Sequence, residues 1–325
     1  MRKVISNSLS VGLITSLFAV SPSSSQQNDG RAQQRPEPTH AEVSYGPYEQ
    51  NVFDLWLADS DDPTPLVIYI HGGGFKGGSY KRISPVTILR LNEAGISVAS
   101  VEYRFISIAK LPAAHYDCRR ALQFIRSKAR EWNLDENRVG AFGGSAGAQL
   151  CMYLGFHDEM AVPDSEDPVA RNSTRLTSLA TSGGQATMDL EWWVEHIPDY
   201  DASHRDRWVY FDMEDEEAFE KTIEEISAIS LLTEDDVPLY MEYQMNPDEP
   251  VPDDPKEARG WKVHHVNFGI KLKERMDELG IENHLVFPGS PENRYGSKEE
   301  FFIQTLANRL PVSDSEKEKD DMGQT

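Results

Sequence analysis

Cysteine is scarce in this sequence, with only Cys118 and Cys151 among 325 residues. Two cysteines rarely crosslink a core of this size, and both lie in helix-like stretches between apolar residues. We therefore expect two buried thiols, with a Cys118–Cys151 disulfide as the alternative if the chain is exported to an oxidising compartment.

Basic residues are also few, because 32 Lys and Arg stand against 54 Asp and Glu, which gives a formal net charge of −22. An acidic field of this size repels phosphate backbones and anionic lipid, which argues against nucleic acid and a membrane surface as partners. The 39% of hydrophobic residues are nevertheless enough for a large buried core. The composition leaves the oligomeric state open.

The apolar run near the N-terminus, Val11–Val20, is too short to span a membrane, which needs about 20 residues. It follows Arg2 and Lys3 and precedes the small residues Ser21–Ser25, an order typical of a secretory signal peptide, predicted over residues 1–25. Such a signal implies a secreted or periplasmic protein with no stable membrane insertion after its removal. A frayed apolar N-terminus is the alternative, and the lack of a following cysteine argues against a lipid anchor.

The two ends of the remaining chain are polar. The Pro- and Gln-rich segment 26–40 is predicted to be a linker, and the charged segment 312–325 a disordered tail. The sequence has no C-x-x-C, H-E-x-x-H or EF-hand pattern, so we expect no metal site.

Between these ends, segments with strand and helix patterns alternate through residues 41–311. Apolar or alternating runs predict strands, and helical spacing predicts helices between them. Strands are expected at 51–57, 65–70, 96–103, 139–142, 176–181, 237–243 and 284–287, and helices at 83–94, 113–131, 146–155, 266–279 and 301–309. This order predicts an α/β fold, with a mostly parallel twisted sheet and helices on both faces. The acidic, aromatic stretch 185–225 breaks the pattern and is interpreted as a lid insertion.

A G-x-S-x-G motif, Gly143–Gly147, ends one predicted strand and opens the next helix. A nucleophilic serine requires such a sharp turn, because the turn lifts the hydroxyl out of the sheet. Glycine two residues before and after lets the neighbouring backbone pass without a Cβ clash. Ser145 is therefore the candidate nucleophile, with a structural Gly-rich turn as the alternative.

A second motif, His71–Phe75, reads His-Gly-Gly-Gly-Phe directly after a predicted strand. The N–H groups of Gly73, Gly74 and Ala146 are candidates for an oxyanion hole. A phosphate-binding loop is the rival interpretation, but no Walker lysine pattern is present. His71 is expected to organise the loop rather than to act as a base.

Together, the two motifs resemble those of the α/β-hydrolase fold in its hormone-sensitive-lipase-like esterase branch, and most of all the bacterial carbohydrate acetyl and feruloyl esterases. The resemblance runs from about Val43 to Leu310 and includes Tyr103-Arg104 and Asp167-Pro168-Val169. It implies a Ser–Asp–His triad, no cofactor, and hydrolysis of small-molecule or carbohydrate carboxylic esters.

The resemblance places the acid of the triad after the seventh strand, in a D-x-x-V-P pattern, which Asp248 fits. The alternative is that Asp248 belongs to a solvent-exposed acidic loop and has no catalytic role. The family's histidine follows the last strand, but Pro288–Gly296 contains none. His264 and His265 are the remaining candidates, with His264 preferred, because they keep the order Ser, acid, His.

The sequence thus predicts acyl transfer through an acyl-enzyme on Ser145. A binding protein that kept the fold and lost its base is one alternative, motivated by the missing histidine, and a serine peptidase is another. Three tryptophans of the insertion, Trp192, Trp193 and Trp208, are expected either to pack the lid or to line the pocket.

Overall fold

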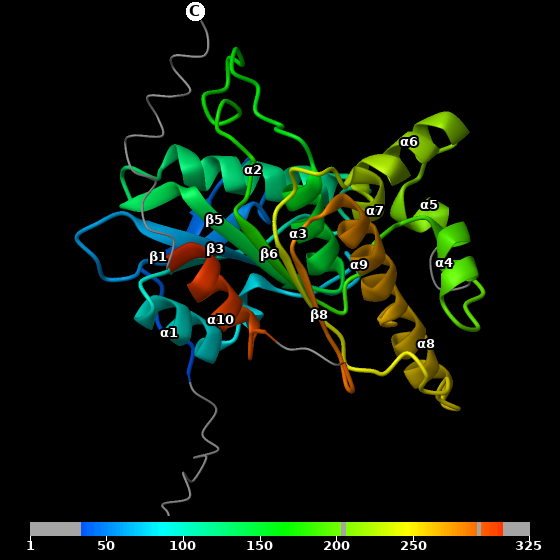
Figure 1. Cartoon of the computed structure of the whole chain (residues 1–325). Coiled ribbons are helices and arrows are strands. Elements are labelled where there is room, and N and C mark those ends of the chain that lie inside the picture. Colours follow the sequence, from blue (N-terminus) through cyan, green and yellow to red (C-terminus); the bar gives the residue numbers. More distant parts are fainter. Residues whose placement is uncertain (1–33, 203–205, 291–293, 308–325) are drawn as a thin grey trace, which may run out of the picture. The chain divides into compact units, whose positions relative to one another are not determined.

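The computed structural model describes residues 34–202, 206–290 and 294–307 (Figure 1). The predicted signal peptide, most of the predicted linker and the predicted tail lie outside these ranges. No helix of the described residues is long and apolar enough to cross a membrane.

The described chain forms an eight-stranded sheet with the strand order β1-β2-β4-β3-β5-β6-β7-β8. Strand β2 pairs antiparallel with β1 on one side and with β4 on the other, and all the other pairings in the sheet are parallel. The strands are β1 His40–Ser44, β2 Val52–Trp56, β3 Thr64–Ile70, β4 Ser97–Val101, β5 Leu134–Gly144, β6 Ser178–Ser182, β7 Leu239–Glu242 and β8 Asn283–Val286. The predicted α/β fold with a mostly parallel sheet is confirmed.

Helices fill the connections between strands. They are α1 Pro85–Glu93, α2 Ala113–Ser127, α3 Ala146–Phe156, α4 Leu190–His196, α5 Arg207–Tyr210, α6 Glu216–Ile226, α7 Ala228–Leu231, α8 Pro255–Val263, α9 Asn267–Leu279 and α10 Lys298–Phe302, with a 3₁₀ turn at Tyr80–Arg82 and a π-helical turn at Ile303–Ala307. Helix α9 ends at Gly280, whose φ of 73° is the left-handed geometry that favours glycine at a helix end.

Both faces of the sheet are buried. Along β3, Leu66, Ile68 and Ile70 join the core cluster under α2, α3 and α9, while Val67 joins the cluster under α1 and α10. The same division into two helical layers is visible in Figure 1. This double burial explains why the strand is a continuous apolar run rather than an alternating one.

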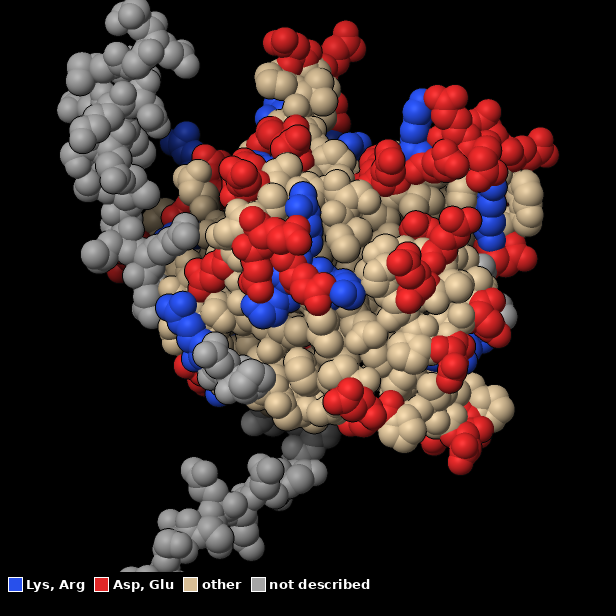
Figure 2. All heavy atoms as spheres, turned by 45° about the vertical axis from the view of Figure 1, so that its right-hand side comes forward, with Lys and Arg blue, Asp and Glu red and all other residues tan. Residues whose placement is uncertain are grey.

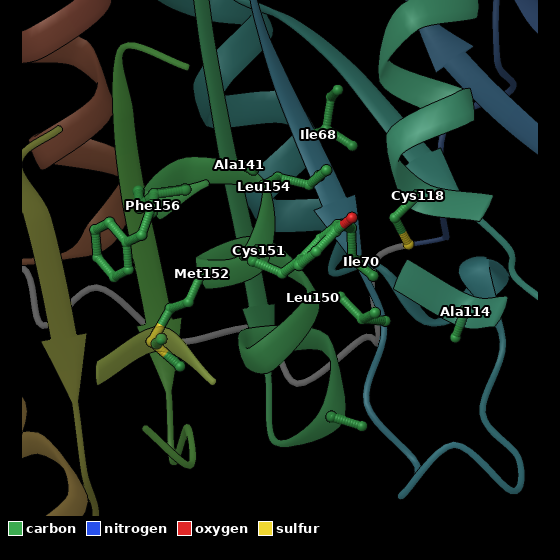
Figure 3. Close-up of a cluster of buried hydrophobic side chains, with 14 of the residues drawn as sticks. Ile68, Ile70, Ala114, Cys118, Ala141, Leu150, Cys151, Met152, Leu154 and Phe156 are labelled. Carbon is green, nitrogen blue, oxygen red and sulfur yellow. The ribbon is translucent and has the colours of Figure 1, made fainter. Parts of the chain in front are cut away.

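The two cysteines lie on different helices of the larger core cluster. Cys118 belongs to α2 and Cys151 to α3, and both are buried and free (Figure 3). Burial raises the pKa of both thiols. The prediction of two buried thiols is confirmed, and the alternative disulfide is not formed.

The end of the predicted linker contacts the sheet. The indole N–H of Trp56 donates to the carbonyl oxygen of Pro36 at 2.9 Å, and Arg35 pairs with Asp54 at 3.0 Å. Residues 34–39 therefore lie against β2, and His40 already belongs to β1.

The insertion at 185–225 is more helical than its sequence suggests. Helices α4, α5 and α6 each begin after an aspartate whose side chain accepts an N–H of the first turn: Asp189, Asp206 and Asp215. These caps stabilise the first turn of each helix, and α4 and α5 are too short to show a clear apolar period. Trp193 is fully buried, and its indole N–H donates to Thr187.

Candidate active site

Ser145 lies at a sharp turn between β5 and α3. Its backbone φ is 54° and ψ is −121°, and its N–H donates to the carbonyl oxygen of Ser182 at 3.0 Å. A Cβ on Gly143 would lie 2.6 Å from the carbonyl oxygen of Ile70, and one on Gly147 would collide with the same atom. The two glycines of the motif are therefore required by close backbone packing, as predicted, and the turn presents the hydroxyl at the edge of the sheet.

The glycine loop after β3 runs beside this turn. A Cβ on Gly72 would lie 2.5 Å from the carbonyl oxygen of Gly144. Gly73 has a φ of 132° and lines the cavity that contains Ser145, whereas Gly74 is not among the lining residues. Ala146 is the first residue of α3, where N–H groups have no partner within the helix.

His71 organises the loop from beneath. Its ring is buried and stacks on Tyr103, with centroids 4.4 Å apart. Nε2 lies 2.6 Å from Oε1 of Glu102 and Nδ1 lies 2.8 Å from the carbonyl oxygen of Gly72. The hydroxyl of Tyr103 also donates to the carbonyl oxygen of His71, at 2.9 Å. Both the ring and the backbone of His71 are therefore held in place. These contacts fit the expected organising role.

The structure brings His264 to the candidate nucleophile. Nε2 of His264 lies 2.9 Å from Oγ of Ser145, and Nδ1 lies 2.9 Å from the carbonyl oxygen of Gly260. Since a carbonyl oxygen only accepts, Nδ1 carries the proton and Nε2 is free to accept one. Burial lowers the pKa of His264 below its ordinary value, so the ring tends to be neutral.

His265 has a different environment. It is fully buried, its ring meets Trp261 edge-on with centroids 4.3 Å apart, and its Nδ1 accepts the N–H of Asn267 at 3.1 Å. Burial lowers its pKa to about 4. The structure thus places His265 in the packing between α8 and α9 and does not bring it to Ser145.

Asp248 is not brought to the histidine. Its side chain is exposed, and its backbone N–H donates to Oδ1 of Asn246 at 2.9 Å. Among the residues that the structure describes, no carboxylate hydrogen-bonds to His264, whose two ring nitrogens contact Ser145 and Gly260. Instead of the expected Ser–Asp–His arrangement, the structure shows Ser145 paired with His264, whose ring contacts a backbone carbonyl oxygen in place of a carboxylate.

Helix α8, which carries Gly260 and Trp261 and is capped by His264, was not predicted from the sequence. Its signal is present in the sequence, because Asp254 accepts the N–H groups of Lys256 and Glu257 and Pro255 occupies the first helical position. The surrounding acidic and proline-rich residues made the stretch resemble a loop.

Two further residues hold His264 in place, and neither was singled out from the sequence. The amide of Gln185 donates to the carbonyl oxygen of Val263 at 2.7 Å, which ties the end of α8 to the loop after β6. A Cβ on Gly183 would lie 3.4 Å from Cδ2 of His264, so the ring packs on bare backbone. These contacts fix the direction of the imidazole.

The pair opens into a cavity of about 570 Å³. The lining residues are Tyr69, His71, Gly72, Gly73, Arg82, Gly144, Ser145, Ser182, Gly183, Gln244, Met245, Gly260, Trp261 and His264. They come from the loops after β3, β5, β6 and β7, so the cavity lies at the carboxyl edge of the sheet, where α/β folds bind ligands.

The described residues of the insertion are not among those that line this cavity. Trp192 stacks on His196 and Phe268, and Trp193 meets Phe268 edge-on. Trp208 is 52% exposed and lies under Arg207. The first two tryptophans therefore pack the insertion against α9, as one of the two interpretations expected.

Known proteins resemble this chain in sequence and in fold. The family model described as BD-FAE matches residues 53–255, more than half of the chain. An arylesterase from Saccharolobus solfataricus is 35% identical over 85 residues, which are 26% of this chain and 28% of the relative. An ethyl acetate hydrolase from Pseudomonas putida is 26% identical over 165 residues, which are 47% of this chain and 52% of the relative. The matches thus span between about a quarter and a half of these relatives.

Solved structures share the fold over more of the chain. A truncated carbohydrate esterase from gut microbiota covers 82% of this chain and 95% of its own, with a TM-score of 0.63 and 20% identity. An acetyl ester-xyloside bifunctional hydrolase from Caldicellulosiruptor lactoaceticus covers 84% and 88%, with a TM-score of 0.57 and 21% identity. At these identities the likeness concerns the fold.

Proposed function

Because the chain belongs to the BD-FAE family, we propose that it is a serine carboxylic-ester hydrolase in which Ser145 is the nucleophile and His264 the base. The observation that carries this proposal is the 2.9 Å separation between Nε2 of His264 and Oγ of Ser145, at the turn that exposes the hydroxyl. A nucleophile and a base within hydrogen-bond reach are the minimum for covalent acyl transfer.

In the first step, Oγ of Ser145 attacks the ester carbonyl carbon while its proton moves to Nε2 of His264. The tetrahedral intermediate collapses, its bond to the alcohol oxygen breaks, and the imidazolium returns the proton to the leaving alcohol. Water then attacks the acyl-enzyme with the same base, which releases the acid and restores Ser145. No cofactor takes part in this sequence.

The negative charge on the former carbonyl oxygen requires donors. The N–H of Ala146 at the start of α3 and the N–H groups of Gly73 and Gly74 are the proposed donors, and Gly73 shares the cavity with Ser145. Loss of a single such donor typically costs about 100- to 1,000-fold in rate.

The end of α8 takes the part that a carboxylate has in a Ser–His–Asp triad. The carbonyl oxygen of Gly260 fixes the tautomer of His264, and His264 itself caps the helix. The carboxyl end of a helix carries a partial negative charge, which stabilises an imidazolium by about 0.3–2 kcal/mol. This arrangement orients the ring of His264 and stabilises its protonated form without a contribution from Asp248.

For the substrate, we propose acyl esters of carbohydrates, such as acetyl or feruloyl esters. Two structural neighbours, a carbohydrate esterase and an acetyl ester-xyloside bifunctional hydrolase, support this class. The Trp261 and Met245 side chains give the cavity an apolar wall beside the polar Ser182 and Gln244, which fits a partly apolar ester. A secreted or periplasmic location, as the N-terminal sequence predicts, is part of the same proposal.

The test is covalent labelling by an organophosphonate, together with turnover of p-nitrophenyl acetate. We expect the label on Ser145 and the loss of both label and turnover in Ser145→Ala. Turnover that survives in Ser145→Ala contradicts the assignment. A folded wild-type protein that neither binds the label nor turns over the ester supports a binding protein instead, and cleavage of aminoacyl amides without ester turnover supports a peptidase.

A further inference from the structure

Arg82 is a cation without a structural partner at the rim of the cavity. It is exposed, it ends the 3₁₀ turn Tyr80–Arg82, and it is one of the residues that line the cavity with Ser145. In the part of the chain that the structure describes, its guanidinium makes no ion pair and no hydrogen bond. The neighbouring Lys81, by contrast, pairs with Glu42 at 2.8 Å.

The cavity differs in charge from the rest of the protein. Asp and Glu number 54 in the chain and are widely spread over the face shown in Figure 2. The described residues that line the cavity nevertheless include no Asp and no Glu, and Arg82 is the arginine among them. A cation on a wall without acidic side chains favours anions at this place more than on the acidic surface around it.

A hydroxyl donor lies in the same cavity. Tyr69 belongs to β3, and its ring is fixed against Phe142, with centroids 5.0 Å apart. Burial raises the pKa of Tyr69, so the phenol keeps its proton at neutral pH, and the charge of Arg82 is close enough to oppose that rise. Tyr69 and Arg82 therefore present O–H and N–H donors to one region of the cavity.

We propose that Arg82, assisted by Tyr69, binds a carboxylate of the substrate, and that this enzyme prefers esters that carry a negative charge. The inference rests on the proposed ester hydrolysis at Ser145, because it assigns the substrate class of that site. A guanidinium presents two parallel N–H groups that match the two oxygens of a carboxylate, and such charge-assisted pairs are stronger than neutral hydrogen bonds.

The carboxylate can belong to either half of an ester. On the alcohol side it is the acid group of an acidic sugar or aryl alcohol, and on the acyl side it is the free end of a dicarboxylic half-ester. Two substrate pairs separate these sources. The first pair is 4-acetoxybenzoate and its methyl ester, and the second is mono(4-nitrophenyl) glutarate and its methyl ester.

The measured quantity is the ratio of kcat/KM for the charged member of a pair to that for its neutral member. Intrinsic reactivity cancels when the ratio of a variant is divided by that of the wild type. In Arg82→Gln we expect this ratio to fall about tenfold for at least one pair, as loss of a charge-assisted contact implies. Arg82→Lys keeps most of the preference, and Tyr69→Phe lowers it by a smaller factor.

The matched control is Arg90→Gln. Arg90 is an exposed arginine of α1 that does not line the cavity, so its loss changes the net charge equally. We expect its ratios to equal those of the wild type. A rise in NaCl from 50 to 500 mM is expected to weaken the charge preference in the wild type and to have little effect in Arg82→Gln.

An equal ratio in Arg82→Gln and wild type for both pairs overturns the proposal, and so does an equal fall in Arg90→Gln. A fall confined to the first pair assigns the carboxylate to the alcohol half, and a fall confined to the second assigns it to the acyl half. The neutral members report on ester hydrolysis itself. If they are not hydrolysed in a Ser145-dependent manner, the proposed function fails, which is distinct from an unchanged ratio.

Discussion

Nδ1 of His264 lies 2.9 Å from the carbonyl oxygen of Gly260, which belongs to helix α8, the helix that His264 caps. The same oxygen accepts the backbone N–H of His264 at 3.1 Å, so one carbonyl group fixes both the backbone and the ring of the base. In the proposed mechanism, the imidazolium of His264 is therefore stabilised by the end of a helix rather than by an acidic side chain.

The two adjacent histidines are expected to behave differently on substitution. His264→Ala removes the group next to Ser145 and is expected to lower kcat on p-nitrophenyl acetate by at least about 100-fold. His265→Asn keeps an acceptor for the N–H of Asn267 and is expected to retain activity within about fivefold of the wild type. Steady-state kinetics on samples with matched circular dichroism test this, and a reversed order of the two losses contradicts the assignment of the base.

Replacement of Asp248 separates the backbone-held pair from a conventional triad. Its carboxylate is exposed and the ring of His264 is already satisfied, so Asp248→Ala is expected to change kcat/KM by less than about threefold. Loss of a triad aspartate typically lowers kcat by about 10⁴-fold. A loss above 100-fold in Asp248→Ala, with Asp248→Asn equally impaired, implies that this loop moves to the histidine during catalysis.

The pH dependence follows from the environment of the base. Burial lowers the pKa of His264 from its ordinary value of 6.5, and the contact with Gly260 opposes this shift only in part. Because the neutral ring is the base, the active form persists to lower pH. We expect kcat/KM to rise with pH with a midpoint below 6.5, in a profile measured on a neutral ester between pH 4 and 8. A midpoint clearly above 6.5 requires an unseen carboxylate partner.

Gln185 couples the loop after β6 to the base. Its side-chain amide donates to the carbonyl oxygens of Val263 and Gly183. Val263 precedes His264 in the sequence, and Gly183 packs against the ring of His264. Gln185→Ala is expected to lower kcat about tenfold with a smaller change in KM, because it loosens the base but leaves the cavity intact. The mutant should keep the labelling site at Ser145 but react with the phosphonate more slowly. An unchanged labelling rate contradicts the positioning role.

Much of the fold was predictable because each element carries a local signal. The run Pro65–Ile70 is apolar because both faces of β3 are covered, and Gly280 marks the end of α9 through its left-handed backbone. The turn at Ser145 required two glycines for steric reasons that sequence alone conveys. Each of these features leaves a local residue-type signal, an apolar run or a glycine at a fixed position, even where the contacting atom, such as the carbonyl oxygen of Ile70, is distant in the sequence.

The proposed base, His264, was harder to predict because its position depends on helix α8, which lies within an acidic, proline-rich stretch. The expected histidine after β8 is absent, and the ring that reaches Ser145 comes from the excursion after β7, 119 residues beyond the serine. Its partner is a backbone carbonyl, which leaves no residue-type signal at Gly260. Arg82 was likewise invisible, because a single exposed arginine gains meaning only when the cavity beside it is known.

His115 is a buried histidine that the proposed mechanism does not use. It is fully buried beside Phe75 and Tyr153, and burial lowers its pKa from 6.5 to about 3. The unfolded chain therefore takes up this proton below pH 6.5 while the folded protein does not, so stability is complete above 6.5 and falls as the pH drops toward 3. One such proton lowers the free energy of unfolding by about 1.4 kcal/mol per pH unit in this window. His115→Phe keeps an aromatic ring and is expected to reduce that slope by about this amount in urea unfolding at pH 6, 5 and 4.5, relative to pH 7. If the slope is the same as in the wild type, the acid sensitivity arises elsewhere, and His265, with its pKa lowered to about 4, is the next residue to replace.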